Sequence, residues 1–159
     1  MQAAEYYNSR PKKATGAWVL FFNSKSELLI VKPNYLDRWL WPGGGIEENE
    51  TPLAAAIRES EEEIGVTPEG IKLAFVQYRP LKTDGQDETI HFVFVAKTVD
   101  DGFLDKLKLG NDELVDAKFV PVDELAKYIS AERAYAVKVY AKSKDKSGGL
   151  YIEGDRVVI

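Results

Sequence analysis

The chain contains no cysteine among its 159 residues and only one histidine, His91. The absence of cysteine excludes a disulfide scaffold, a thiol nucleophile and a zinc site with cysteine ligands, and it fits a reducing compartment. A lone histidine within an apolar run is more often packed and hydrogen-bonded than catalytic, so we expect His91 to be structural.

A basic excess and a long apolar run are also missing. The net charge of −5 argues against a broad nucleic-acid surface, which would normally be basic. The longest apolar run, Ala17 to Phe22, is too short to span a bilayer, and the first thirteen residues lack the apolar segment of a signal peptide. We therefore expect a cytoplasmic protein with no membrane partner and no extended nucleic-acid partner; a homodimer stays open.

The stretch from Trp41 to Val66, WPGGGIEENETPLAAAIRESEEEIGV, organises the chain. Thr51-Pro52 is typical of a helix start, and Gly65 is typical of the residue just past a helix end. Between them one stripe of the helix, predicted to face the core, holds Leu53, Ala56, Ile57, Ser60 and Ile64. Because Ser60 stands where a large apolar residue is expected, a neighbouring element should pack closely there.

A second face of this helix is acidic. Glu59, Glu62 and Glu63 follow an i, i+3, i+4 spacing, and like charges at this spacing cost about 0.2–0.5 kcal/mol per pair. Arg58 can pair with Glu61 or Glu62, and the helix has no lysine. The arrangement alone is compatible with a solvated acidic face or with a site for a hard divalent cation, which prefers carboxylate and carbonyl oxygens.

The spacing decides between these two interpretations. Gly44, Glu50, the pair Arg58-Glu59, the pair Glu62-Glu63 and Gly65, followed by the apolar Val66, form the signature of residues 44–66. Seven fixed positions, each met by chance about one time in 15, coincide about once in 10^8 starting points. This stretch resembles the Nudix hydrolases, including MutT-like proteins. Ser60 and Asn49 depart from the usual pattern, but asparagine tolerates the positive φ that the more frequent glycine adopts.

The resemblance implies a metal-dependent hydrolase that cleaves the pyrophosphate linkage of a nucleoside diphosphate joined to a group X, with Mg²⁺ or Mn²⁺ as cofactor. Glu62 and Glu63 are then the main metal ligands and Glu59 is a further ligand or the base. Arg58 is expected to orient a glutamate without touching the substrate. Glu50 is expected to be either an outer metal ligand or a structural residue. Attack by water on a P–O–P linkage needs cations that neutralise the phosphate oxygens and a positioned water that can lose its proton, and these residues would meet both needs.

Further candidates come from the sequence around the signature. The glycines at 43–45 allow backbone and phosphates to approach closely, and a carbonyl oxygen near Gly43 or Gly44 could complete the metal shell. Glu113 is the candidate for an additional acidic ligand, with Asp112 next. Side chains that could contact the substrate include Lys32, Tyr35, Arg38, Trp39, Tyr78 and Arg79.

The substrate is less defined by the sequence. Pro80, about fifteen residues past the signature, weakly supports ADP-ribose, whereas no tyrosine occupies the positions that would favour dinucleoside polyphosphates. A nucleotide sugar, ADP-ribose or (d)NTP is the expected substrate class. A hydrolase that decaps RNA 5′ ends and a non-catalytic nucleotide sensor are the alternatives, and the intact glutamate set argues against the sensor.

The order of predicted elements is strands, helix, strands, helices in one domain, 1–159, after a loosely held lead-in at 1–13. Predicted strands cover 15–22, 28–31, 71–79, 89–98 and 114–121, with a hairpin joining the first two. Helices are expected at 123–130 and 131–142, one helical turn at 103–107, and a terminal hairpin around 153–155. The pattern predicts an α/β (α+β) fold with a mixed sheet between helices, and the resemblance implies an α/β/α sandwich whose motif is loop–helix–loop.

Overall fold

Two β-sheets form the centre of the protein in a computed structural model that describes residues 3–80, 88–110, 113–143 and 149–159. Among these residues the larger sheet has the strand order β3-β1-β5-β4-β7-β8 and mixes parallel and antiparallel pairs, and the smaller one pairs β2 with β6. The strands are β1 (Ala14–Leu20), β2 (Glu27–Pro33), β3 (Gly43–Gly45), β4 (Lys72–Arg79), β5 (Thr89–Val95), β6 (Leu114–Pro121), β7 (Tyr151–Glu153) and β8 (Arg156–Val157).

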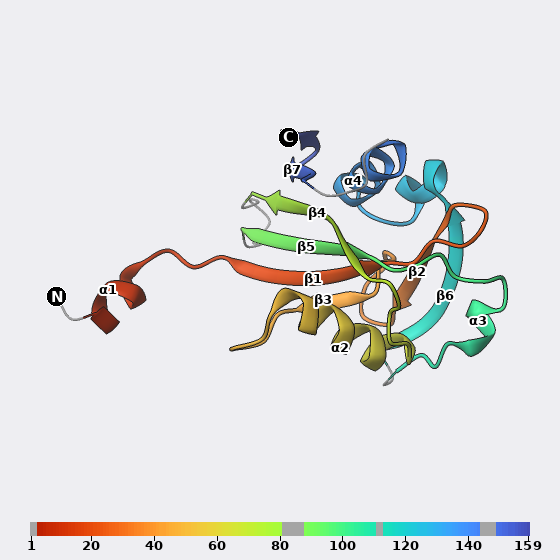
Figure 1. Ribbon diagram of the computed structural model, residues 1–159, viewed down its shortest axis with the longest axis horizontal. Coiled ribbons are helices and arrows are strands. Elements are labelled where there is room, and N and C mark those ends of the chain that lie inside the picture. Colours follow the sequence, from red (N-terminus) through yellow and green to blue (C-terminus); the bar gives the residue numbers. More distant parts are fainter. Residues whose placement is uncertain (1–2, 81–87, 111–112, 144–148) are drawn as a thin grey trace.

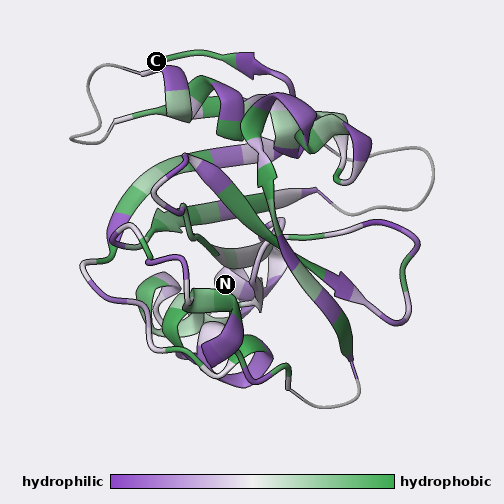
Figure 2. Cartoon of the chain, turned by 90° about the vertical axis from the view of Figure 1, so that its right-hand side faces the viewer, coloured by the Kyte–Doolittle hydropathy of each residue, from purple (hydrophilic) through white to green (hydrophobic). Residues whose placement is uncertain are grey.

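Helices cover both faces of the larger sheet. In Figure 1, α2 (Pro52–Ile64) lies on one side of the sheet and α4 (Ala131–Lys142) lies on the other, preceded by the short 3₁₀ helix η1 (Val122–Lys127). Figure 2 shows hydrophobic and hydrophilic residues alternating within the helices, as expected when one face packs on a sheet. The predicted α/β layering, with a mixed sheet between helices, is confirmed.

Alternate side chains of β1 pack into two different hydrophobic cores, one on each face of the larger sheet. Ala17 and Val19 point into the core beneath α2, whereas Trp18 and Leu20 point into the core beneath α4. Successive strand residues face opposite sides, so a strand covered on both sides is apolar throughout. The same alternation places Val93 of β5 on the α4 side and Phe94 on the α2 side, which confirms that β5 is a central strand.

Helix α2 begins and ends as predicted. The Thr51 hydroxyl accepts a hydrogen bond from the Ala54 amide at 3.2 Å, and Gly65 adopts the left-handed conformation with φ 69°. The buried side chains of the helix are Ala55, Ala56, Ser60 and Ile64, and Ser60 is fully inaccessible. The prediction that Leu53 faces the core is wrong, because Leu53 is 44% exposed. Small residues at the contact let the helix lie close to the sheet, as expected from Ser60.

Three local predictions need correction. The predicted hairpin of 15–31 exists only as the single bridge Phe22 to Leu28, because β1 and β2 belong to different sheets. The glycine run forms the short edge strand β3, where a loop was expected. The lead-in contains a helix, α1 (Ala3–Ser9), but all its residues are exposed, and it extends away from the sheets in Figure 1.

The remaining elements agree with prediction. The helical turn at 103–107 is α3 (Phe103–Lys106), and β7 and β8 form the terminal hairpin. None of the helices described here is long and apolar enough to cross a bilayer.

Candidate active site

The glycines of β3 lie against the acidic face of α2. The Gly43 amide donates a 2.8 Å hydrogen bond to Oε2 of Glu63. At Gly44, an added Cβ would stand 2.7 Å from the carboxyl carbon of Glu59, so only glycine leaves room for that carboxylate. The Gly44 carbonyl oxygen lies on the β1 side, 3.2 Å from where a Cβ on Gly16 would stand. The glycine strand therefore fixes two of the predicted ligands.

Arg58 ties the other charged positions of the signature together. Its Nε and Nη2 donate to the two carboxylate oxygens of Glu50 at 2.8 and 2.9 Å, a bidentate pair. Its Nη1 donates to Glu59 at 2.8 Å and to Glu62 at 3.1 Å, and Nη2 also reaches the Gly45 carbonyl oxygen at 3.1 Å. One guanidinium thus orients three carboxylates.

The sequence predicts that Arg58 pairs with either Glu61 or Glu62, and the structure shows the pair with Glu62. Arg58 pairs with Glu62, whereas Glu61 accepts a 2.6 Å hydrogen bond from the Thr67 hydroxyl. Glu61 therefore points away from the face that holds Glu59, Glu62 and Glu63.

Burial makes two of these carboxyls hard to ionise. It raises the pKa of Glu63 to about 8, against the hydrogen bond from Gly43, and the negative charges of Glu59 and Glu113 add to the rise. Burial also raises the pKa of Glu59, although Arg58 opposes this effect. In contrast, the hydrogen bonds from Arg58 lower the pKa of Glu50 to about 2. The site carries acidic charge that its protein neighbours do not fully compensate.

The charges of Glu63 and Glu113 both act on Tyr35. Burial and then the charges of Glu63, Glu113 and Glu59 raise the pKa of the Tyr35 hydroxyl, which requires these groups to be near one another. Glu113 is exposed, and its backbone carbonyl accepts a 2.7 Å hydrogen bond from the Asn34 amide. Asp112, the second candidate for this position, lies outside the described residues.

Within the described part of the chain, no three acidic or histidine side chains already stand in an arrangement that could hold a metal ion. The geometry gives the reason: oxygens of Glu59 and Glu62 are turned to Arg58, and Oε2 of Glu63 is turned to the Gly43 amide. These hydrogen bonds use one oxygen of each carboxylate.

The conformation of Gly43 supports a stability prediction. Gly43 has φ +141°, and an added Cβ would stand 2.3 Å from the Ala17 carbonyl oxygen. We expect Gly43→Ala to lower the free energy of unfolding by about 2–5 kcal/mol, because strain and overlap with β1 combine. Gly45→Ala is the matched control, since its Cβ meets nothing within 4 Å. Equal denaturant midpoints for the two variants would contradict this account.

Three candidate substrate contacts have partners within the protein. Trp39 is half-buried with its ring edge-on to Tyr128 at 6.3 Å, and the Lys118 ammonium lies 4.4 Å from its centroid, so its ring is already engaged within the protein. Arg79 is buried, and its Nε donates to Glu132 at 3.0 Å. Tyr78 donates to Glu88 at 2.5 Å.

The sequence reasoning missed Arg133, a buried residue of α4. Its guanidinium lies 4.2 Å from the Trp18 ring centroid and 5.1 Å from that of Trp41. Ala136, Val137 and Tyr140 follow at i+3, i+4 and i+7 and are buried. A charged residue on the apolar stripe of a helix was the signal that could have revealed it.

His91 is buried, as expected for a packed residue. Its ring centroid lies 5.5 Å from that of Trp18, and Nδ1 has no hydrogen-bond partner among the described residues. Burial, together with the charges of Arg133 and Arg79, lowers the pKa of His91 to about 3. His91 is therefore uncharged at neutral pH.

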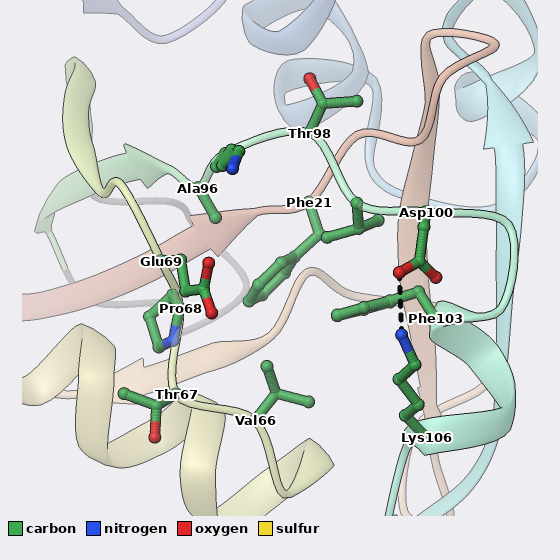
Figure 3. Close-up of a pocket in the computed structure, with 12 residues that line it drawn as sticks. Phe21, Val66, Thr67, Pro68, Glu69, Ala96, Thr98, Asp100, Phe103 and Lys106 are labelled. Atoms are coloured by element: carbon green, nitrogen blue, oxygen red, sulfur yellow. Dashed lines mark hydrogen bonds and ion pairs between the residues drawn. The ribbon is translucent and has the colours of Figure 1, made fainter.

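A separate hollow of about 470 Å³ opens beyond the end of α2 (Figure 3). Phe21, Val66 and Phe103 contribute apolar surface, and an ion pair joins Asp100 to Lys106 at 2.8 Å. None of Glu59, Glu62 and Glu63 lines this hollow, so it lacks the acidic chemistry of the signature.

Comparisons with known proteins agree with this arrangement. The NUDIX domain family matches residues 12–140. The RNA pyrophosphohydrolase of Hydrogenovibrio crunogenus is 38% identical over 55 residues, 35% of this chain and 33% of that protein. The human diphosphoinositol polyphosphate phosphohydrolase 3-alpha is 50% identical over 50 residues, 30% of each. The chain spans about a third of the length of these relatives.

Solved structures match over most of the chain. The MutT protein of Methanosarcina mazei superposes with a TM-score of 0.68 at 20% identity, covering 84% of this chain and 97% of that one. The NUDIX domain of Shewanella oneidensis NrtR, solved with ADP ribose, gives 0.66 at 17% identity, covering 89% and 97%. At these identities the structures establish the fold. Together with the family match, they show that the chain belongs to the Nudix family of hydrolases.

Proposed function

We propose that the protein is a metal-dependent pyrophosphohydrolase that directs water onto phosphorus in the P–O–P linkage of a nucleoside diphosphate joined to a group X. The observation that carries this proposal is the shared face of Glu59, Glu62 and Glu63, oriented by Arg58 and by the β3 glycines. A solvated acidic face would not need a buried carboxylate held by a main-chain amide.

The donor set fits Mg²⁺ or Mn²⁺. Carboxylate and carbonyl oxygens are the ligands that hard cations prefer, and Glu59, Glu62 and Glu63 supply carboxylates from one face of α2. We assign Glu62 and Glu63 as main ligands, with Glu59, Glu113 and the Gly44 carbonyl oxygen as further donors. A bound cation would neutralise phosphate oxygens and lower the pKa of a coordinated water.

The protein's own groups then have defined tasks. Arg58 holds Glu59 and Glu62 in place and is itself fixed by the bidentate pair with Glu50. Glu59 is close to Gly44 and half-buried, and we propose that it binds a cation or accepts the proton of the attacking water. The space beside Gly45 is open, since an added Cβ would meet nothing within 4 Å there, and it leaves room for the diphosphate to approach the backbone.

The names of the relatives given above refer to chemically different compounds: RNA, a diphosphoinositol polyphosphate and ADP ribose. We therefore keep a nucleoside diphosphate derivative as the substrate class. An RNA 5′ end remains the second candidate because one relative is an RNA pyrophosphohydrolase, although the net charge of −5 disfavours an extended RNA surface. A cytoplasmic location stays a prediction.

A substrate panel tests the proposal. The protein is incubated with Mg²⁺ or Mn²⁺ and with ADP-ribose, nucleotide sugars, dinucleoside polyphosphates, normal and oxidised NTPs, diphosphoinositol polyphosphates and 5′-triphosphate RNA. Products are separated by chromatography and identified by mass. Metal-dependent cleavage of one class at a P–O–P linkage supports the proposal. Tight nucleotide binding with no cleavage of any compound would favour the non-catalytic sensor.

A further inference from the structure

Three arginines from separate elements line one small pocket. Arg38 comes from the loop before β3, Arg79 from the end of β4 and Arg133 from the first turn of α4, and the pocket has a volume of about 190 Å³. Ser130, the N-cap of α4, lines it too, so the partial positive charge at the start of this helix also points there. We call this the arginine pocket.

Arg133 is the arginine of this pocket whose burial and missing hydrogen bond point most directly to a ligand. Its side chain is 6% exposed, and Nη1 has no hydrogen-bond partner among the described residues. Burial lowers the pKa of Arg133 to about 9, and the charges of Arg79 and Arg38 add to this effect. A buried cation with an unpaired N–H is costly, and an anion bound in the pocket would reduce that cost.

Packing explains only part of this arrangement. The stacking of Arg133 on Trp18 and Trp41 is favourable, but a ring face does not satisfy an in-plane N–H donor. Glu132 accepts from Arg79 and compensates some of the charge. The negative charges of Glu63 and Glu132 act on Arg133 against the positive charges of Arg79 and Arg38.

The arginine pocket is also close to the candidate active site. The charges of Glu63 and Arg133 influence each other, although Glu63 lies on α2 and Arg133 on α4. Trp41, which contacts Arg133, is followed within two residues by Gly43, whose amide binds Glu63. A single extended substrate could therefore occupy both places.

We propose that the arginine pocket binds a phosphate group of the substrate that lies outside the scissile linkage. This inference rests on the proposed function, and it narrows the substrate to compounds whose X group carries or ends in phosphate. Planar guanidinium groups bind phosphate oxygens through paired, charge-assisted hydrogen bonds, and a pocket of this size holds one such group. A neutral sugar in the same position could accept hydrogen bonds but would leave the positive charge of the arginines uncompensated.

Anion binding without metal separates this inference from hydrolysis. Tripolyphosphate is titrated into metal-free protein in chelator, followed by calorimetry and by thermal melting. We expect binding and a raised melting temperature for the unmodified protein, and at least about a tenfold weaker affinity for Arg133→Met. Arg156→Met is the control, because Arg156 is exposed and pairs with Glu153. Absent binding, or equal affinity in Arg133→Met and the control, would overturn the inference.

A second variant guards against a folding defect. Arg38 is exposed, so Arg38→Met should fold normally. With a hydrolysed substrate whose X group carries phosphate, we expect KM to rise about tenfold with kcat nearly unchanged, and the rise in KM to be several times smaller for a substrate with a neutral X group. An equal rise for both substrates would contradict phosphate recognition. Hydrolysis without tripolyphosphate binding would reject the pocket assignment alone, whereas binding without hydrolysis would reject the proposed function alone.

Discussion

Glu62→Gln and Glu63→Gln each lower turnover at least about a hundredfold while the fold stays intact, if these carboxylates hold the cation that activates water. Glutamine keeps the size of the side chain and one oxygen but loses the negative charge. For Glu63 it also keeps an acceptor for the Gly43 amide, so the position of β3 should not change. Steady-state kinetics at saturating Mg²⁺ measures the effect, and circular dichroism checks the fold.

Glu61→Gln provides the matched control for this experiment. Glu61 lies on the same helix and next to Glu62 in sequence, but its carboxylate accepts a hydrogen bond from the Thr67 hydroxyl. We expect turnover within about twofold of the unmodified protein, as for a surface change away from the reacting groups. A loss in Glu61→Gln as large as in Glu63→Gln would point to a general charge effect, and near-normal turnover in Glu62→Gln and Glu63→Gln would exclude the metal site.

The same Glu63→Gln substitution stabilises the metal-free protein. The folded-state pKa of about 8 lies above the ordinary value of 4.5, so the folded protein keeps a proton that the unfolded chain releases. The stability linked to this carboxyl is complete below about pH 4.5 and is lost as the pH rises towards 8. At pH 7 the cost is about 3 kcal/mol, and a neutral glutamine removes it.

Denaturant unfolding in chelator at pH 5 and pH 7 measures this gain. We expect Glu63→Gln to exceed the unmodified protein in free energy of unfolding at pH 7 and to approach it at pH 5. Adding Mg²⁺ should stabilise the unmodified protein more than the variant, because binding to the folded state alone raises stability. A Glu63→Gln protein that is less stable than the unmodified one at pH 7 in chelator would show that the carboxyl is not strained by burial.

Local chemistry made much of this fold predictable. The ends of α2 follow from Thr51 and Gly65, whose capping roles depend on neighbouring residues only. The positive φ of Asn49 follows from a tolerance that few side chains share. The apolar run of β5 predicts a strand covered on both faces, since such a strand needs no polar side.

Long-range pairing was not predictable in the same way. The sequence predicts one hairpin from β1 and β2, but β2 pairs with β6, some ninety residues further along the chain. Nothing in either strand specifies that partner. The packing of Glu59 against Gly44 and the hydrogen bond from Gly43 to Glu63 depend on how β3 lies along α2. The arginine pocket joins three distant segments. Arg38 and Arg79 were candidates for substrate contact from the sequence, whereas Arg133, a charge on an apolar stripe, was missed.

The central claim is that these glutamates, with a divalent cation, direct water onto phosphorus. The most direct measurement is hydrolysis in ¹⁸O-labelled water, with the substrate found in the panel, followed by mass analysis of both phosphorus-containing products. We predict one labelled oxygen on one of the two products. We also predict that the products form with Mg²⁺ or Mn²⁺ and do not form in chelator. Label on neither product, or an unchanged rate in chelator, would contradict the account.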